Sequence, residues 1–196
     1  MTEFLETICF EEGNACCLQD HEARMNATRR HFWPDEAPLQ LASFVTPQSD
    51  KGRLRCRVVY HREIVSVNYY PYTPRPVHSL QCIDIGTGEY AYKYADRSML
   101  DAWYAQRGEA DDVLLLRNGL LTDTSIANVA LWNGSEWHTP EKPLLAGTHR
   151  ARLLQNGVLK PRLLRVEDLD SYETIVLFNA MLHFGEVQLP VSAIRM

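Results

Sequence analysis

A lysine set among tyrosines is the residue of this chain best suited to covalent chemistry. Only four of the 20 basic residues are lysine, and Lys51, Lys142 and Lys160 lie in turn-like or loop-like segments beside glycine or proline. Lys93 alone lies in an aromatic segment, Tyr-Ala-Tyr-Lys-Tyr, which we expect to end a strand. Neighbours that exclude water lower the pKa of an ammonium group, and the neutral amine can attack a carbonyl to form a Schiff base. The same pattern also suits a lysine whose stem lies on tyrosine rings while its ammonium reaches water.

Three other segments could add polar groups to such a site. Gly-Thr-His-Arg at 147–150 opens a predicted helix, and Asn-Ala-Met at 179–181 follows a predicted buried strand. Backbone N–H groups at a helix start, together with a guanidinium, bind phosphate. Asp123 ends one predicted strand, and Asn128 begins the next. Each pattern also has an ordinary explanation, because most helix starts bind only water and Asp and Asn are common in turns.

Other clusters point less clearly to chemistry. Cys16, Cys17 and His21 are close in sequence, but adjacent cysteines point apart in a strand and no second ligand pair follows, so we predict no metal site there. Gly-Thr-Gly at 86–88 lacks the third glycine of a dinucleotide fingerprint and the lysine of a P-loop, and we predict a turn. Four arginines of one basic strand could bind a substrate carboxylate or pair with some of the 25 acidic residues: Arg53, Arg55, Arg57 and Arg62.

The elements that must position these residues are mostly strands. Asn-Gly at 118–119 and at 133–134 predicts two hairpins with two-residue type I′ turns, over residues 113–124 and 129–139, because Asn and Gly best tolerate positive φ. Alternating or β-branched patterns predict strands at 55–60, 64–70 and 79–85, and a short apolar run predicts a buried strand at 175–178.

Helical signals are fewer. We predict a helix at 21–32 with Asp20 as its N-cap and with Met25, Thr28 and Phe32 on one stripe. Apolar spacing predicts a second helix over about 99–107, and a short third one at 148–155 is entered through Gly147. Hairpins imply antiparallel pairing, so the predicted class is α+β. The proline-rich stretch 71–76 is either a surface loop or the connector between an N-terminal lobe, 1–76, and a C-terminal lobe, 77–196.

Size and charge narrow the class of protein. The 196 residues are 45% hydrophobic, which suffices for one compact domain or two small lobes. A net charge of −5 argues against a surface for nucleic acid or anionic membranes, and no apolar run is long enough to span a bilayer. The first residues lack the basic start of a signal peptide, and five irregularly spaced cysteines suit reduced thiols. We therefore expect a cytoplasmic globular protein.

The order of the weak signals resembles the class IV aminotransferase family, the fold-type IV pyridoxal-phosphate (PLP) enzymes. The series is His-Glu-Ala-Arg at 21–24, Tyr-Lys-Tyr-Ala-Asp-Arg at 92–97, the segment 122–128, Thr-Pro at 139–140, and then the segments at 147–150 and 179–180. The similarity covers about residues 4–181. Within the family, the run from Lys93 to Arg97 is similar to the Lys-x-x-Asn-Arg signature of 4-amino-4-deoxychorismate lyase, with Asp96 where Asn is usual.

The resemblance implies a role for each matching residue. Lys93 would form the Schiff base with PLP and move the substrate Cα proton. Arg24 would pair with the cofactor phosphate, and Arg97 would lie near the phenolic oxygen. Asp123 stands where the family has Glu, against the pyridine nitrogen, which an acid keeps protonated. Further cofactor contacts would come from Asn128, Thr148, His149, Asn179 and Ala180. Candidates for a substrate carboxylate contact are Arg57 and Tyr92.

The resemblance also implies a fold and a function. The fold would be a two-lobed, D-amino-acid-aminotransferase-like α+β structure with a shortened N-terminal lobe, because the chain starts after the family's first strand. A homodimer is expected, since family members complete their pockets across a subunit interface. The predicted activity is that of the lyase on a small amino-acid-like substrate, with release of pyruvate and 4-aminobenzoate. A branched-chain or D-amino-acid aminotransferase, or a relative that has lost catalysis and serves as a binding or scaffold protein, are the alternatives.

Overall fold

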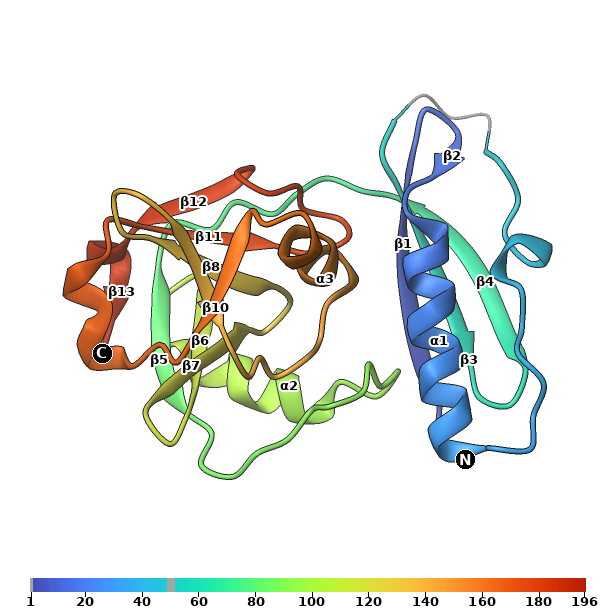
Figure 1. Ribbon diagram of the computed structural model, residues 1–196, viewed down its shortest axis with the longest axis horizontal. Coiled ribbons are helices and arrows are strands. Elements are labelled where there is room, and N and C mark those ends of the chain that lie inside the picture. Colours follow the sequence, from blue (N-terminus) through green and yellow to red (C-terminus); the bar gives the residue numbers. More distant parts are fainter. Residues whose placement is uncertain (1, 49–51) are drawn as a thin grey trace. The chain divides into compact units, whose positions relative to one another are not determined.

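The chain folds into two compact units, each with its own sheet (Figure 1). The structure is a computed structural model that describes residues 2–48 and 52–196, so most of the turn expected around Lys51 lies outside the described residues. The first unit comprises the chain up to Pro74 together with Tyr92–Asp96, and the second comprises Arg75–Ala91 and Arg97–Met196. The division therefore falls inside the proline-rich stretch, and the segment that contains Lys93 belongs to the first unit.

The first unit is a four-stranded antiparallel sheet with one long helix on one face. The sheet order is β2-β1-β3-β4. Alternate residues of β1 explain the packing, because Phe4, Ile8 and Phe10 form one buried cluster with Met25 of helix α1. The elements are β1 (Phe4–Glu11), β2 (Asn14–Ala15), α1 (Leu18–Phe32), the 3₁₀ turn η1 (Leu41–Ser43), β3 (Leu54–Tyr60) and β4 (Ile64–Pro71).

Helix α1 begins three residues earlier than its sequence predicts. Its N-cap is Cys17, in the left-handed conformation at φ 51° and without a side-chain cap. A tight turn joins β1 to β2, and the chain must then reverse sharply into the helix, which the backbone of Cys17 accomplishes. Asp20 therefore lies in the first helical turn, where a carboxylate still favours the helix dipole. The predicted stripe is confirmed, since Met25 and Thr28 are buried and Phe32 packs against the same core.

The second unit is a mixed sheet of nine strands with short helices. Its main path runs β10-β9-β8-β7-β6-β5-β13, and β11 pairs with both β8 and β12. The α+β class is confirmed. The elements are β5 (Leu80–Asp84), α2 (Ser98–Tyr104), η2 (Ala105–Arg107), β6 (Asp112–Arg117), β7 (Leu120–Thr124), β8 (Asn128–Trp132), β9 (Trp137–Pro140), α3 (Thr148–Gln155), β10 (Leu159–Arg162), η3 (Val166–Ser171), β11 (Thr174–Phe178), β12 (Val187–Pro190), η4 (Val191–Ala193) and β13 (Ile194–Arg195).

The two Asn-Gly hairpins turn in different ways. Between β6 and β7, Asn118 and Gly119 both have positive φ, 54° and 74°, which confirms the two-residue turn. The type I′ turn predicted at Asn133 is wrong: the last paired residues of β8 and β9 are Trp132 and Trp137, so the loop has four residues. The Oδ1 atom of Asn133 accepts hydrogen bonds from the backbone N–H groups of Ser135 and Glu136, and this side-chain capping stabilises the wider loop.

Other predictions about local structure hold with one exception. The predicted strands at 55–60, 64–70, 79–85 and 175–178 are present as β3, β4, β5 and β11, and the predicted third helix is α3. The exception is Lys93, which does not end a strand. The backbone N–H of Tyr94 instead bonds the carbonyl of Tyr92 at 3.0 Å, a tight turn centred on Lys93. Within residues 2–48 and 52–196, no helix is both long and apolar enough to cross a bilayer.

Candidate active site

A buried carboxylate at the end of β7 is the chemical centre of the second unit. Asp123 is 4% exposed. Its Oδ1 accepts a hydrogen bond from Nδ2 of Asn128 at 2.7 Å, and its Oδ2 accepts one from the backbone N–H of Leu145 at 2.7 Å. Burial raises the pKa of Asp123 to about 6, although both hydrogen bonds and the charge of Arg150 favour the ionised form. The carboxylate is therefore fixed in place by two neutral donors.

The start of helix α3 lies directly beside this carboxylate. Nδ2 of Asn128 also donates to the carbonyl of Leu145, just before the helix. Gly147 is the N-cap, and a Cβ atom added to it would collide with Oδ1 of Asn128, so this close approach requires glycine. The N–H groups of the first helical turn, which include those of Thr148 and His149, have no acceptor within the helix. They can therefore bind an anion at this point.

The loop after β11 is joined to the same helix start. His149 donates from Nδ1 to the carbonyl of Asn179 at 2.7 Å, and burial lowers the pKa of His149, which favours the neutral imidazole. The side chain of Asn179 closes its own loop by accepting from the N–H groups of Met181 and Leu182. Its Nδ2 donates to the carbonyl of Ile126 at 3.0 Å. Ala180 thus lies in a loop anchored to both α3 and the β7–β8 turn.

Arg97 reaches the β7–β8 turn from a third segment. Its Nη2 donates to the carbonyl of Ser125 at 3.0 Å, and its Nε lies 3.7 Å from Asp101 in helix α2. The second unit therefore holds most of the predicted cofactor residues on three neighbouring segments: the β7–β8 turn, the start of α3 and the loop after β11. These residues are Asp123, Asn128, Thr148, His149, Asn179 and Ala180, and Arg97 contacts the first of the three segments. Arg150 of the same helix has a structural role, because its buried guanidinium donates hydrogen bonds to the hydroxyl of Thr139 and to the carbonyl of Pro140.

In the first unit, Arg24 belongs to a buried ionic group. Its Nε and Nη2 donate to the two carboxylate oxygens of Glu6, at 2.9 and 2.6 Å. Nδ1 of His21 lies 2.7 Å from Oε2 of the same Glu6. Glu6 is fully buried, which by itself raises its pKa, but Arg24 and His21 together lower that pKa to about 2. Glu6 is the residue that the motif series misses, although an acid between Phe4 and Ile8 on an alternating strand signals a buried partner.

Lys93 lies beside the start of β1 in the same unit. Its carbonyl accepts the backbone N–H of Leu5 at 2.8 Å, and the N–H of Ala95 bonds the carbonyl of Glu3 at 2.9 Å. Lys93 is partly buried. These bonds attach an irregular segment to the edge of a regular strand, which positions the Lys93 backbone without making it part of the sheet.

The two residues proposed to contact a substrate carboxylate have different environments. The ring of Tyr92 packs among those of His31, Phe32 and Phe4, with centroids 5.1, 4.9 and 6.2 Å away. Arg57 lies in the middle of β3, opposite Thr7 of β1, and is partly buried.

Two of the other sequence clusters, the Gly-Thr-Gly segment and the basic strand, make ordinary structural contacts. Gly86 has a φ of +58° and bonds Oδ1 of Asp84, which confirms a turn. Within the basic strand, Arg53 pairs with Glu11 at 2.9 Å, and Arg55 lies over the ring of Tyr70.

Comparison with known proteins identifies the family. A family model described as class IV amino-transferase matches residues 3–189. A Schizosaccharomyces pombe protein provisionally named aminodeoxychorismate lyase is 39% identical over an alignment of 203 positions that covers 91% of this chain and 86% of that protein. The crystal structure of a Haemophilus somnus protein, provisionally described as a 4-amino-4-deoxychorismate lyase, is 32% identical, with a TM-score of 0.84 over 92% of this chain and 97% of that one.

A more distant structure shares the fold. The PLP-bound form of a hypothetical aminotransferase from Mycobacterium tuberculosis has a TM-score of 0.79 at 21% identity, over 98% of this chain and 80% of that one. The family model matches nearly the whole described chain, and two relatives exceed 30% identity over nine-tenths of it. The chain therefore belongs to the class IV aminotransferase family and is an enzyme with the fold-type IV architecture of PLP-dependent aminotransferases and lyases.

Proposed function

We propose that this enzyme is a PLP-dependent lyase that converts 4-amino-4-deoxychorismate into pyruvate and 4-aminobenzoate. The observation that supports PLP chemistry best is the buried carboxylate of Asp123, which lies next to the start of helix α3, where free backbone N–H groups can bind an anion. The choice of a lyase rests on two relatives above 30% identity that are provisionally described so, and on the lyase-like spacing of Lys93, Asp96 and Arg97.

The donor set of the second unit fits a phosphorylated pyridine. A protonated ring nitrogen is a cation, and Asp123 is a buried acid whose direct partners in the described chain are neutral hydrogen-bond donors. When bound, PLP supplies an electron-withdrawing ring that stores the charge left by proton removal. Asp123 is one methylene shorter than Glu, and its bonds to Asn128 and Leu145 fix the position from which it must reach the ring nitrogen.

The phosphate would be bound by backbone and side-chain groups together. The N–H groups of Thr148 and His149 and the segment Asn179–Ala180 supply the donors expected of a phosphate site. Arg24 is proposed to add a positive charge, in an orientation set by its two bonds to Glu6.

Proton transfer at the substrate Cα is assigned to Lys93. Its amine would hold the cofactor covalently in the resting enzyme, then take the Cα proton and later return one. Arg97 is proposed to lie at the phenolic oxygen of the ring. Arg57 and Tyr92 are the proposed contacts for the substrate carboxylate.

The activity test is direct. Purified protein incubated with aminodeoxychorismate and no keto acid is expected to release pyruvate and 4-aminobenzoate in equal amounts. Release of neither product, together with amino transfer from a branched-chain or D-amino acid to a keto acid, would replace the lyase by a transaminase that uses the same residues.

The role of Lys93 has its own test. Protein purified with added PLP is expected to show the visible absorbance band of lysine-bound cofactor, and Lys93→Ala is expected to lose it. Lys142→Ala, at an exposed loop lysine, is the matched control and should keep the band. A band that persists unchanged in Lys93→Ala rules out this role. Absence of any band in the wild-type protein would favour a relative that has lost catalysis.

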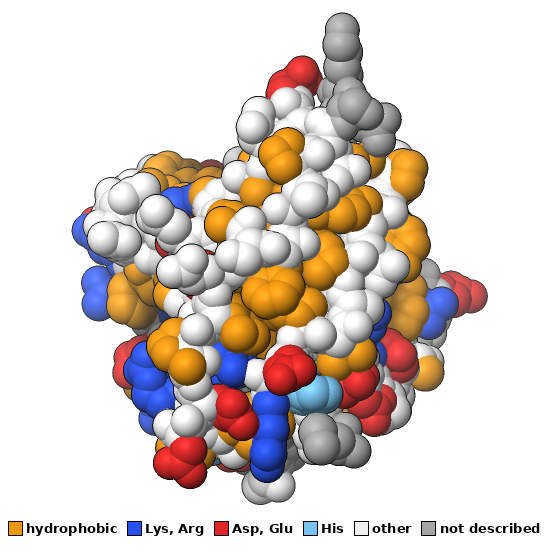
Figure 2. Space-filling view, turned by 90° about the vertical axis from the view of Figure 1, so that its right-hand side faces the viewer, with side chains coloured by type: hydrophobic (Ala, Val, Ile, Leu, Met, Phe, Trp, Pro, Cys, Tyr) orange, Lys and Arg blue, Asp and Glu red, His pale blue; other side chains and the backbone are white. Residues whose placement is uncertain are grey.

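We also propose a homodimer. Hydrophobic side chains gather on a face of the first unit (Figure 2). Three large hydrophobic side chains in this unit are well exposed, Phe44 at 40%, Val65 at 47% and Tyr70 at 42%. A contiguous exposed apolar patch often marks an interface. Light scattering is expected to give twice the chain mass of 22.5 kDa, and a mass of 22.5 kDa at micromolar concentration would contradict the proposal.

A further inference from the structure

Two cysteines and a glutamate come together on the β1–β2 hairpin, apart from the residues assigned above. Strand pairing explains the arrangement. Phe10 pairs with Ala15, and the backbone N–H of Cys16 bonds the carbonyl of Cys9 at 2.8 Å, so Cys9 and Cys16 are cross-strand neighbours. Glu11 is two residues beyond Cys9 on the same strand, and its side chain therefore points to the same face of the hairpin.

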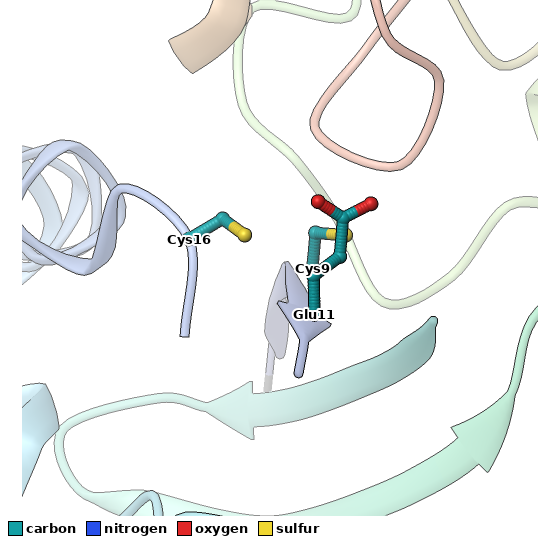
Figure 3. A group of neighbouring side chains, drawn as sticks. All are labelled: Cys9, Glu11 and Cys16. Carbon is teal, nitrogen blue, oxygen red and sulfur yellow. The ribbon is translucent and has the colours of Figure 1, made fainter. Parts of the chain in front are cut away.

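The three side chains are close enough to share one ligand. Their Sγ and carboxylate oxygen atoms all lie within 4.8 Å of one another. In Figure 3 the sulfur of Cys16 points toward Cys9, and the carboxylate of Glu11 lies beside the sulfur of Cys9. A tetrahedral zinc ion with Zn–S bonds of about 2.3 Å separates two ligand sulfurs by ~3.8 Å. Small side-chain rotations would bring these donors to such distances.

The charges around the hairpin also suit a cation. Cys9 is buried, and Glu11 and Cys16 are partly buried, so the three donor groups are shielded from bulk water. A divalent ion bound between the sulfurs would displace both thiol protons to solvent. Arg53 pairs with Oε1 of Glu11 at 2.9 Å, which offsets part of the negative charge of a dithiolate–carboxylate set.

The other cysteines lack such neighbours. In the described ranges, Cys9, Glu11 and Cys16 make the one group of three potential ligands from Cys, His, Asp and Glu. Cys17 is exposed and occupies the left-handed N-cap of α1, which directs the chain away from the hairpin. Thiolates are the donors that a thiophilic divalent ion prefers, and a carboxylate oxygen can also bind Zn²⁺.

We propose that Cys9, Glu11 and Cys16 bind one thiophilic divalent ion such as Zn²⁺, with the fourth position taken by water. This site does not depend on the proposed lyase activity. It lies in a segment, residues 9–16, that contributes no residue to the proposed cofactor site.

The test uses the full chain with bound cofactor, reduced and freed of metal by a chelator. Equilibrium dialysis against Zn²⁺ alone is expected to give one ion per chain. Co²⁺ is expected to produce the intense visible bands of a tetrahedral site with thiolate ligands. Since loss of an outer-sphere partner alone weakens metal sites by about 10–100-fold, Cys16→Ser should weaken Zn²⁺ binding by more than about 100-fold. Glu11→Gln should weaken it by at least about tenfold.

Cys17→Ser is the matched control and should bind Zn²⁺ like the wild type. Cys9 is deeply buried, so Cys9→Ser could fail to fold. Cys16 is only partly buried, so we expect Cys16→Ser to fold and to provide the test. Binding that is substoichiometric in the wild type, or unchanged in Cys16→Ser, overturns the proposal. A second result would also overturn it: a Cys9–Cys16 disulfide in protein purified without reductant, together with no Zn²⁺ uptake by the reduced protein. The two cysteines would then be a redox couple.

Discussion

One buried carboxylate in each unit, Glu6 in the first and Asp123 in the second, offers a comparison, because the two are stabilised in opposite ways. Glu6, in the first unit, is in contact with Arg24 and His21, and its pKa is lowered to about 2. Asp123, in the second unit, is bonded by an amide and a backbone N–H, and its pKa is raised to about 6. Burial removes both carboxylates from water, which disfavours their ionised forms. Of the two, only Glu6 has a cation in direct contact that offsets this effect.

We propose that this difference separates an acid with a structural role, Glu6, from an acid with a functional one, Asp123. An ionised carboxylate that is already matched by a guanidinium has little to gain from a further cation. A carboxylate bonded only by neutral donors gains much when a cationic ligand arrives, because its own charge is then stabilised. The protonated ring nitrogen of PLP is such a ligand. We therefore expect Glu6 to affect stability first and Asp123 to affect cofactor chemistry first.

The largest effect is expected from Glu6→Gln. Removal of one partner of a buried ion pair leaves Arg24 without its counter-charge, which typically costs about 3–5 kcal/mol of unfolding free energy. Urea unfolding followed by circular dichroism measures this cost. A loss below about 1 kcal/mol, as for an exposed ion pair, would contradict the assignment of Glu6 as the charge that stabilises the first unit.

Asp123→Asn should leave the fold intact and impair catalysis. Loss of a preorganised charge at a reacting group lowers kcat by about 10²–10³-fold. The absorbance of bound cofactor should shift, because its ring nitrogen would lose its proton. Asp123→Glu retains the carboxylate and serves as the matched variant, with at least partial recovery of kcat. Equal kcat in wild type and Asp123→Asn would show that Asp123 does not face the ring.

Sequence patterns could predict much of the second unit, because its signals are local. Asn118-Gly119 determines one hairpin turn, and the Asp123–Asn128 spacing places both residues at adjacent strand ends. Gly147 marks the entry of α3, although only the structure shows that its lack of a side chain makes room for Asn128.

The first unit is harder to predict from the sequence, because its main contacts join segments that are distant in the sequence. The pairing of Glu6 with Arg24 depends on how α1 lies across β1, 18 residues away in sequence. The early start of α1 depends on the tight hairpin before it, and the geometry at Lys93 depends on backbone bonds to β1. A local sequence pattern cannot predict these contacts, because each one joins two segments that are far apart in the sequence.

The pH dependence of stability should have opposite signs at the two acids in cofactor-free protein. Glu6 has a folded-state pKa below its ordinary value of 4.5, so its stabilisation is present above pH 4.5 and is lost as the pH falls toward about 2. Asp123 has a folded-state pKa above its ordinary 3.8, so its protonated form favours folding, and this benefit is lost as the pH rises through about 6.

Unfolding free energies measured from pH 4 to pH 7 test this difference. The stability of Asp123→Asn relative to wild type should rise across this range, because the wild-type protein then buries a charge that the variant lacks. The stability of Glu6→Gln relative to wild type should fall over the lower part of the range. Parallel curves for Asp123→Asn and wild type would mean that Asp123 titrates near its ordinary value.

The smallest effect is expected from His21→Gln, which tests what keeps Glu6 ionised. Arg24 bonds both oxygens of Glu6, whereas His21 approaches only Oε2. If the guanidinium supplies most of the stabilisation, a glutamine that can still donate one hydrogen bond should cost about 0.5–1.5 kcal/mol. Arg24→Gln should cost as much as Glu6→Gln, because it leaves the acid buried without its cation. Equal losses for His21→Gln and Arg24→Gln would mean instead that a charged imidazole shares the pairing, and that the first unit needs two cations to keep one carboxylate ionised.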